Sequence, residues 1–332
     1  MSQEAELNAG GRPVSPARTG DERSPAMSRE LGRVRQQRSL WGNAWRQFRR
    51  HRLAMVGTVV LLFLILATLF GPFLYGRATD IPFEYTSSQR PSLDNLLGTD
   101  SLGQDVLARI LWGGRISIAV GLIAAAVSIV LGTAIGAISG FFGGVTDALL
   151  MRITDMFISL PQLPLLLLVS FLFKNEMVTL FEDRFGAGNL GVFVLIVGVI
   201  GILNWMPTAR LVRASFLAMK EKEFVEAARS IGATRSNIIF RHILPNVLSP
   251  IIVAATLGVG EAIITESSLS FLGLGFPSDV PTWGRMLFEA KDYLQLSPHE
   301  SLIPGTMIFL TVLSINYMGD GLRDALDPRK SQ

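Results

Sequence analysis

Two carboxylates inside an apolar stretch are the residues of this sequence best suited to chemistry. Glu261 and Glu266 fall within residues 247–273, a stretch long enough to cross a lipid bilayer. An ionised acid near the bilayer centre costs about 2.5–3.5 kcal/mol on insertion scales, which disfavours a lipid-facing position for Glu261, near mid-span. We therefore predict that both acids belong to a translocation path, with Glu266 nearer its outer end.

Two roles are open for these acids. The carboxylates could contact a peptide amine or a cation along the path, or they could form structural hydrogen bonds within a helical bundle. A stand-alone, ion-coupled secondary carrier or channel would also use an intramembrane acid, with Glu261 as its ion-linked group. Dependence of transport on an ion gradient, without ATPase subunits, would distinguish that alternative.

The residue types of common enzyme sites are missing. The cysteine count is 0, which excludes disulfides, thiolate metal sites and a cysteine nucleophile. The three histidines, His51, His242 and His299, are far apart in the sequence and predict no metal site. No lysine follows a glycine, so the phosphate-binding motif GK[ST] is absent. We expect no enzyme activity and no cofactor in this chain, so that any ATP must bind to another chain.

Residues 220–246 are the longest charged segment between the first and last apolar spans. Read as a helix, Phe224, Ala228 and Ile231 fall at i, i+4 and i+7 and share one face. Gly232 is expected to end this helix, because glycine adopts a positive φ at little cost.

A second short helix is expected after that turn, with the apolar residues 238–240 in it and Pro245 at its end. The pattern alone is compatible with a loop on the membrane surface or with an amphipathic helix that lies in the groove of another protein.

The composition predicts an all-α integral membrane protein, since 49% of the residues are hydrophobic and only 17% are charged, against about 25% in soluble proteins. A small residue at every fourth position from Ala124 to Gly144 would allow another helix to approach closely in lipid. Six transmembrane helices are predicted, at 53–75, from 116 to about 146, within 156–173, within 187–209, at 247–273 and at 302–318.

The flanking segments set the orientation. Lysine and arginine gather in the segment through residue 52 and in residues 210–245, which places both of these segments and both termini in the cytoplasm. The remaining segments are a disordered cytoplasmic tail (1–38), an interfacial amphipathic helix with Trp45 and Phe48 (39–52), an extracytoplasmic loop with Asp100, Asp105 and Arg109 (76–115), a core with five transmembrane helices (116–318) and a cytoplasmic C-terminal tail (319–332). A nucleic-acid-binding role for the basic residues before 53 is disfavoured, because a membrane span follows at once.

Several separated motifs resemble those of a known transporter family. Glu226-Ala227-Ala228, Gly232 and Leu244-Pro245 have the spacing of the EAA loop of ATP-binding-cassette importer permeases, with His242 where the pattern has Ile. Residues 96–118, 266–276, 281–287 and 319–329 resemble the second permease subunit of dipeptide, oligopeptide and nickel importers. Gln104 stands where that family often has Arg. The resemblance covers about residues 40–329.

This resemblance implies a type I ABC importer permease fold in a bacterial cytoplasmic membrane. It also implies four kinds of partner: a second homologous permease, two ATPase subunits that bind ATP and Mg, an extracytoplasmic solute-binding protein and the bilayer itself. The residues that would couple the permease to the ATPases are Glu223, Phe224, Glu226, Ala227, Ala228, Gly232 and Pro245. Peptides are the expected solute, and nickel or another small solute stays open because the binding protein selects first.

Overall fold

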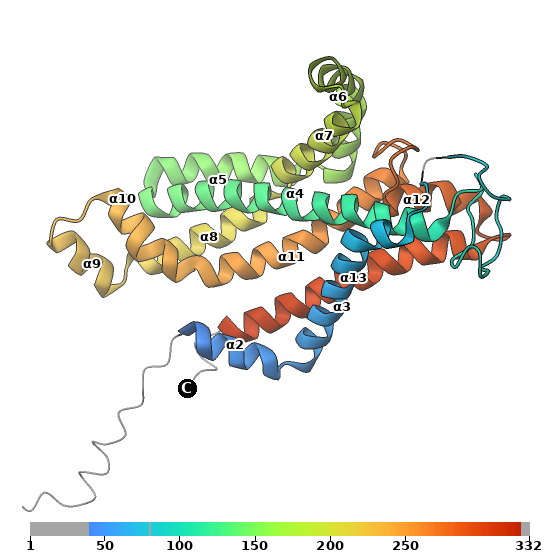
Figure 1. Ribbon diagram of the computed structural model, residues 1–332. Coiled ribbons are helices and arrows are strands. Elements are labelled where there is room, and N and C mark those ends of the chain that lie inside the picture. The colour runs from blue at the N-terminus through green and yellow to red at the C-terminus, as the bar shows by residue number, and fades with distance from the viewer. Residues whose placement is uncertain (1–39, 80, 327–332) are drawn as a thin grey trace, which may run out of the picture. The chain divides into compact units, whose positions relative to one another are not determined.

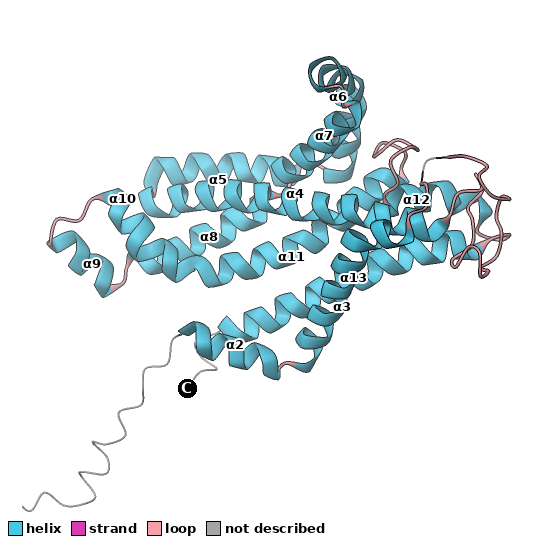
Figure 2. Cartoon of the chain, in the orientation of Figure 1, coloured by secondary structure: helices cyan, strands magenta, loops and turns pink. Residues whose placement is uncertain are grey.

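The computed structural model describes residues 40–79 and 81–326. The chain divides into two units, residues 1–42 and 43–332, and the first of these is described only where α2 begins. The predicted disordered tail (1–38) lies outside the described residues. Figure 2 shows that the regular structure of the described part is helical. The helices are α2 (Leu40–Arg50), α3 (Arg52–Tyr75), α4 (Val106–Phe142), α5 (Gly144–Ser159), α6 (Gln162–Phe185), α7 (Gly188–Leu203), α8 (Trp205–Lys220), α9 (Glu223–Ser230), α10 (Arg235–Asn237), η1 (Ile238–Ile243), α11 (Leu244–Phe271), α12 (Trp283–Ala290), η2 (Lys291–Tyr293) and α13 (Pro298–Leu326).

Five helical segments of the described chain are long and apolar enough to cross a membrane: α3, α4, α6, the continuous stretch Arg235–Phe271 and α13. A sixth candidate is the pair α7 and α8, which is bent by 41° at Asn204. The all-α membrane architecture with six predicted spans is therefore confirmed, if the bent pair is counted as one span.

The helix that contains the second predicted span begins ten residues before that span. We placed it after Arg115, whereas α4 begins at Val106 with the Asp105 carboxylate accepting a hydrogen bond from Ala108 N at its N-terminus (2.9 Å). Arg115 does not end this helix, and its guanidinium donates to the carbonyls of Thr68 (2.8 Å) and Leu69 in the C-terminal half of α3. The last ten residues of the loop predicted at 76–115 are therefore helical.

The predicted third span, 156–173, crosses a break between two helices. α5 ends at Ser159, and α6 runs from Gln162 to Phe185. Leu160 is extended (ψ 136°), as expected for a residue that precedes a proline, and Pro161 precedes the first residue of α6. α13 is also longer than predicted, because it continues through residues 319–326, which we assigned to the C-terminal tail.

Small residues allow α4 to pack closely on α8. A Cβ at Gly132 would lie 2.7 Å from the Trp205 carbonyl oxygen, and one at Gly136 would lie 2.4 Å from that of Ala209. In Figure 1, α4, α8 and α11 lie alongside one another, with α9 and α10 near one end of these helices and α12 near the other. The regular spacing of small residues thus serves packing within the chain.

Candidate functional site

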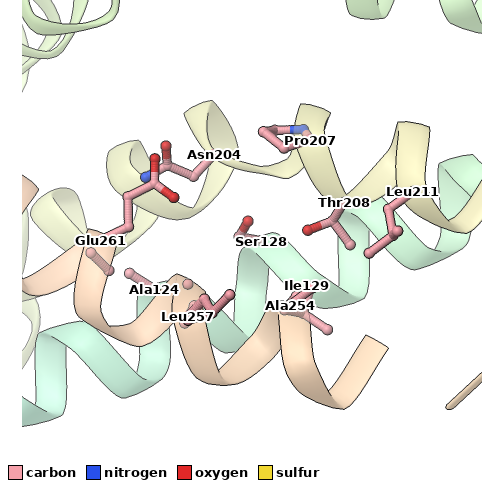
Figure 3. A pocket seen from close by; sticks show the side chains of 13 residues that line it. Ala124, Ser128, Ile129, Asn204, Pro207, Thr208, Leu211, Ala254, Leu257 and Glu261 are labelled. Carbon is pink, nitrogen blue, oxygen red and sulfur yellow. The ribbon is translucent and has the colours of Figure 1, made fainter. Parts of the chain in front are cut away.

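A cavity of about 200 Å³ lies among α4, α11 and the bend between α7 and α8 (Figure 3). Its polar lining comes from Ser128, Asn204, Thr208 and Glu261, and the rest of its wall is mostly apolar. The apolar part consists of Ala124, Ala125, Ile129, Pro207, Leu211, Ala254, Leu257, Gly258 and Ala262.

Glu261 borders more than this one cavity. Its side chain is exposed, and it also lines two further cavities of about 400 and 420 Å³. Within the described residues, the Glu261 carboxylate has no hydrogen-bond or ion-pair partner, and its backbone carbonyl accepts from Thr265 Oγ1 (2.8 Å). Figure 3 shows this carboxylate turned toward the side chain of Asn204.

A hydrogen bond links the break between α5 and α6 to the break between α7 and α8. Gln162, the first residue of α6 after the break at Leu160 and Pro161, donates from Nε2 to Oδ1 of Asn204 (2.5 Å). Asn204 is the residue at which α7 ends and α8 begins. Gln162 lines both of the larger cavities that Glu261 shares, so the breaks and the carboxylate border the same spaces. In transporters, interrupted membrane helices often form the solute site.

Sequence reasoning did not select Gln162 or Asn204. An asparagine within an apolar span is a visible signal, since a polar side chain in lipid requires a partner. The pairing itself, across 42 positions, depends on the tertiary structure.

Glu266 has different surroundings from Glu261. It is fully buried, and its carboxylate accepts hydrogen bonds from Ser270 Oγ (2.8 Å) and Ser117 Oγ (3.3 Å). Ser117 Oγ in turn accepts from the backbone N–H of Trp283, at the start of α12 (3.2 Å). These contacts match the structural hydrogen bond that we considered for both acids, and a lining role for Glu266 stays a prediction.

The charged segment after α8 presents one face of α9 to solvent. Glu223, Phe224, Glu226 and Ala227 are exposed there. Val225 and Ala228 are buried against an apolar cluster that includes Phe141, Phe216, Ile238, Ile243 and Val247.

The predicted common face of Phe224, Ala228 and Ile231 is therefore incorrect. Ala228 packs inward together with Val225, three residues before it, whereas Phe224 and Ile231 are exposed by 41% and 86%. Ile231 follows the last helical residue of α9, so the helical spacing no longer places it.

Gly232 ends α9 as predicted. Its φ is +82°, and the Ala233 N–H donates to the Ala228 carbonyl (3.0 Å) while the Gly232 N–H donates to that of Arg229 (3.0 Å). This pair of hydrogen bonds is the Schellman motif, which requires the left-handed conformation at the glycine. An added Cβ would meet no atom within 4 Å.

The second short helix differs from the prediction. α10 is followed directly by a π-helical segment, η1 (Ile238–Ile243), and then by α11. Pro245 therefore does not end a helix but lies exposed in the first turn of α11. Leu244 N donates to the Ile239 carbonyl, five residues back. This wider turn carries the chain without a break into α11, and Pro245, which has no backbone N–H to donate, lies directly after it.

An ion pair near the end of α4 ties α5 to α8. The guanidinium of Arg213 on α8 pairs with the Asp147 carboxylate in the first turn of α5, which also accepts from Ser139. The hydrogen bonds from Arg213 hold the pKa of Asp147 below its ordinary value. Asp147 is thus fully charged at neutral pH and fixes α8 where it leads toward α9.

An all-helical bundle of spans with a polar cavity at two interrupted helices is typical of a membrane transport protein. Residues 132–332 match the family model described as "Binding-protein-dependent transport system inner membrane component". Residues 39–97 match the N-terminal TM domain of oligopeptide transport permease C.

Curated relatives align over most of the chain. The dipeptide transport system permease protein DppC of Alkalihalophilus pseudofirmus is 37% identical over 88% of this chain and 90% of its own length. The glutathione transport system permease protein GsiD of Pectobacterium atrosepticum is 38% identical (88% and 92% covered). The oligopeptide transport system permease protein OppC of Bacillus subtilis is 38% identical (88% and 90% covered).

The chain belongs to the family of binding-protein-dependent transport system inner membrane components, and it is a multi-pass permease component. The resemblance seen in the sequence motifs is confirmed.

Proposed function

We propose that this chain is the permease subunit of an ATP-driven importer for di- or oligopeptides. The three relatives carry the names of dipeptide, glutathione and oligopeptide systems, and these solutes share peptide groups and a free amino group. The partners are a second homologous permease, two ATPase subunits that hold ATP and Mg, and an extracytoplasmic solute-binding protein.

The exposed face of α9 carries the proposed link to the ATPases. Phe224 and Ala227 are exposed while Val225 and Ala228 anchor the same helix to the core. An exposed apolar strip on a short helix fits a groove in a partner, and the small side chain of Ala227 permits close approach. Glu223 and Glu226 give the rim of this strip a negative charge, which favours a basic rim on the ATPase.

Motion is transmitted from α9 through packed elements. The buried side of α9 contacts the cluster formed with α4, α8 and η1, and η1 continues into α11, which carries Glu261. Displacement of α9 by the ATPases would therefore shift α11 and the cavity wall together. Nucleotide drives transport only if it favours one of two states of this bundle over the other.

The placement in the membrane follows from the same proposal. Both termini and α9 lie in the cytoplasm, and the segment around α12 lies outside. On α2, Trp45, Arg46, Arg49 and Arg50 are exposed, while Phe48 is buried against Ala54. This arrangement suits a helix at the membrane interface with its arginines toward anionic lipid.

Co-purification from mild detergent tests the proposal. Ala227→Arg places a long charged side chain on the exposed face of α9, and Ser236→Arg places the same side chain at an exposed site on α10. Tagged wild type and Ser236→Arg should recover the second permease and the ATPases, and Ala227→Arg should lose the ATPases alone. Recovery of the wild-type chain without any ATPase would overturn the proposal and favour the stand-alone carrier.

A further inference from the structure

The geometry points to a binding site for the amino-terminal end of the transported solute, in which the Glu261 carboxylate binds the ammonium group and the amides of Asn204 and Gln162 bind the first peptide group. This inference rests on the proposed function, because it assigns the solute contacts of that same permease. Three independent features of the cavity region support it: an unpaired carboxylate, a pair of side-chain amides and an apolar wall.

The unpaired charge is the first feature. An intramembrane carboxylate normally has a partner. On the same helix, α11, the Glu266 carboxylate accepts hydrogen bonds from the hydroxyl groups of Ser270 and Ser117. Glu261 has no such partner within the described residues, and it borders three cavities. Arg210, the basic residue that lines one of them, is already paired with Asp155. A cationic ligand group would therefore complete the site.

The two amides are the second feature. The hydrogen bond between Gln162 Nε2 and Asn204 Oδ1 uses one donor and one acceptor. A side-chain amide has two donors and one carbonyl oxygen. The Gln162 oxygen and the Asn204 nitrogen consequently stay available for a ligand that supplies both a donor and an acceptor. A peptide group supplies this pair whatever its side chain is.

The apolar wall is the third feature. The wall of the 200 Å³ cavity beside Glu261 includes the small residues Ala124, Ala254 and Gly258. Leu257, which also lines this cavity, lies one helical turn before Glu261 on α11. The cavity of about 420 Å³ that contains Glu261, Asn204 and Gln162 together is also lined by apolar side chains, among them Leu165 and Met206, and its volume falls within the range of about 300–1,000 Å³ that is typical of small-molecule sites. Such walls accept side chains of different shapes, whereas the polar groups bind only what all peptides share.

The absence of cysteine from the chain allows a direct test. Leu257→Cys would place a thiol about 6 Å from the Cβ of Glu261, the spacing of residues four apart in a helix. In the assembled transporter without nucleotide, we would compare the rates at which a cationic and an anionic methanethiosulfonate reagent modify this thiol, and read the label on the separated chain. Leu272→Cys, after the end of α11, is the control position.

We define the ratio as the modification rate with the cationic reagent divided by the rate with the anionic reagent. This ratio should be higher for Leu257→Cys than for Leu272→Cys. Adding Glu261→Gln to Leu257→Cys should lower the ratio at least about fivefold. Adding Glu176→Gln instead, which removes an exposed acid on α6, should leave the ratio unchanged. Trialanine should slow modification of the thiol in Leu257→Cys, N-acetyl-trialanine should not, and Glu261→Gln should abolish the protection.

An unchanged ratio on adding Glu261→Gln would overturn the inference, because the carboxylate would then be protonated or paired with a group of another subunit. Equal protection by both peptides would also overturn it. Uptake of trialanine by the Leu257→Cys transporter in proteoliposomes is measured in parallel. If that uptake depends on ATP while the labelling tests fail, the inference fails and the proposed function stands.

Discussion

The side chains of Arg109 and Glu289, which stand 180 positions apart, form an ion pair with 2.9 Å between Nη2 and Oε2. The same guanidinium pairs with Asp100, and Glu289 also accepts from Arg285 Nε (2.8 Å). Arg109 is only 1% exposed. One buried cation thus joins the loop before α4, α4 itself and α12. Asp100 and Arg109, which we had assigned to the extracytoplasmic loop 76–115, are thus held against α12 of the same chain.

Replacement of Arg109 by Met should destabilise the chain by about 3–5 kcal/mol, because Asp100 would keep its charge in a largely buried site without a cation and Glu289 would keep only its pair with Arg285. The comparison is Arg210→Met, which breaks the exposed pair with Asp155 and should cost about 0–1 kcal/mol. Thermal unfolding of the purified transporter in detergent measures both. Equal midpoints for the two variants would show that the buried network contributes no more than a surface pair.

Gly136→Ala should destabilise the packing of α4 on α8 by about 1–3 kcal/mol. Its Cβ would lie 2.4 Å from the Ala209 carbonyl oxygen and 3.0 Å from the Arg213 backbone nitrogen, and backbone atoms cannot rotate away. Gly198→Ala in α7 is the matched control, since its Cβ would meet nothing within 4 Å. The midpoint of thermal unfolding should fall for Gly136→Ala and not for Gly198→Ala. A fall of the same size in both would mean that glycine is needed for reasons other than this contact.

Neutralising the exposed arginines of α2 should remove a dependence of transport on anionic lipid. In proteoliposomes, wild type should import peptide several-fold faster with phosphatidylglycerol than with phosphatidylcholine alone, since each arginine near an anionic surface gains about 1 kcal/mol. The triple variant of Arg46, Arg49 and Arg50 to Gln should show equal rates in both lipids. Arg90→Gln, at an exposed site in the outer loop, is the control and should keep the wild-type difference.

The number of spans and their approximate positions could be predicted, because about 20 apolar residues are needed to cross a bilayer and such runs are visible in a sequence. The ends of the helices that contain them could not. Arg115 looked like a boundary, but carbonyls of α3, 46 and 47 positions earlier, receive its hydrogen bonds. Charge in a span is tolerated where the fold supplies such partners, and the sequence does not display them.

The candidate site was predictable to a similar degree. The two acids were recognisable as unusual for a span, yet their different surroundings depend on Ser117, 149 positions away from Glu266. Gly232 was predictable because a local turn requires its conformation, whereas the burial of Ala228 depends on α4 and α8. Local conformation was therefore easier to infer than the side on which a helix packs.

Gly232→Val should weaken the link between the permease and the ATPases and so slow uptake. The residue has a φ of +82°, and a left-handed conformation costs a non-glycine residue about 1–2 kcal/mol, more for a β-branched one. No atom lies within 4 Å of an added Cβ, so the cost arises from the backbone conformation alone. Relief of this strain would change φ at residue 232 and with it the angle between α9 and the segment that follows. A shift of about 1.4 kcal/mol would lower the population of the docking geometry about tenfold.

Gly232→Asn is the control, because asparagine adopts the left-handed conformation far more readily. We expect about tenfold slower peptide uptake by Gly232→Val in proteoliposomes, with the same amount of chain in the membrane, and nearly normal uptake by Gly232→Asn. If both variants lost uptake equally, the requirement would be for the absence of a side chain in the partner's groove, and the positive φ of Gly232 would not be what sets the coupling.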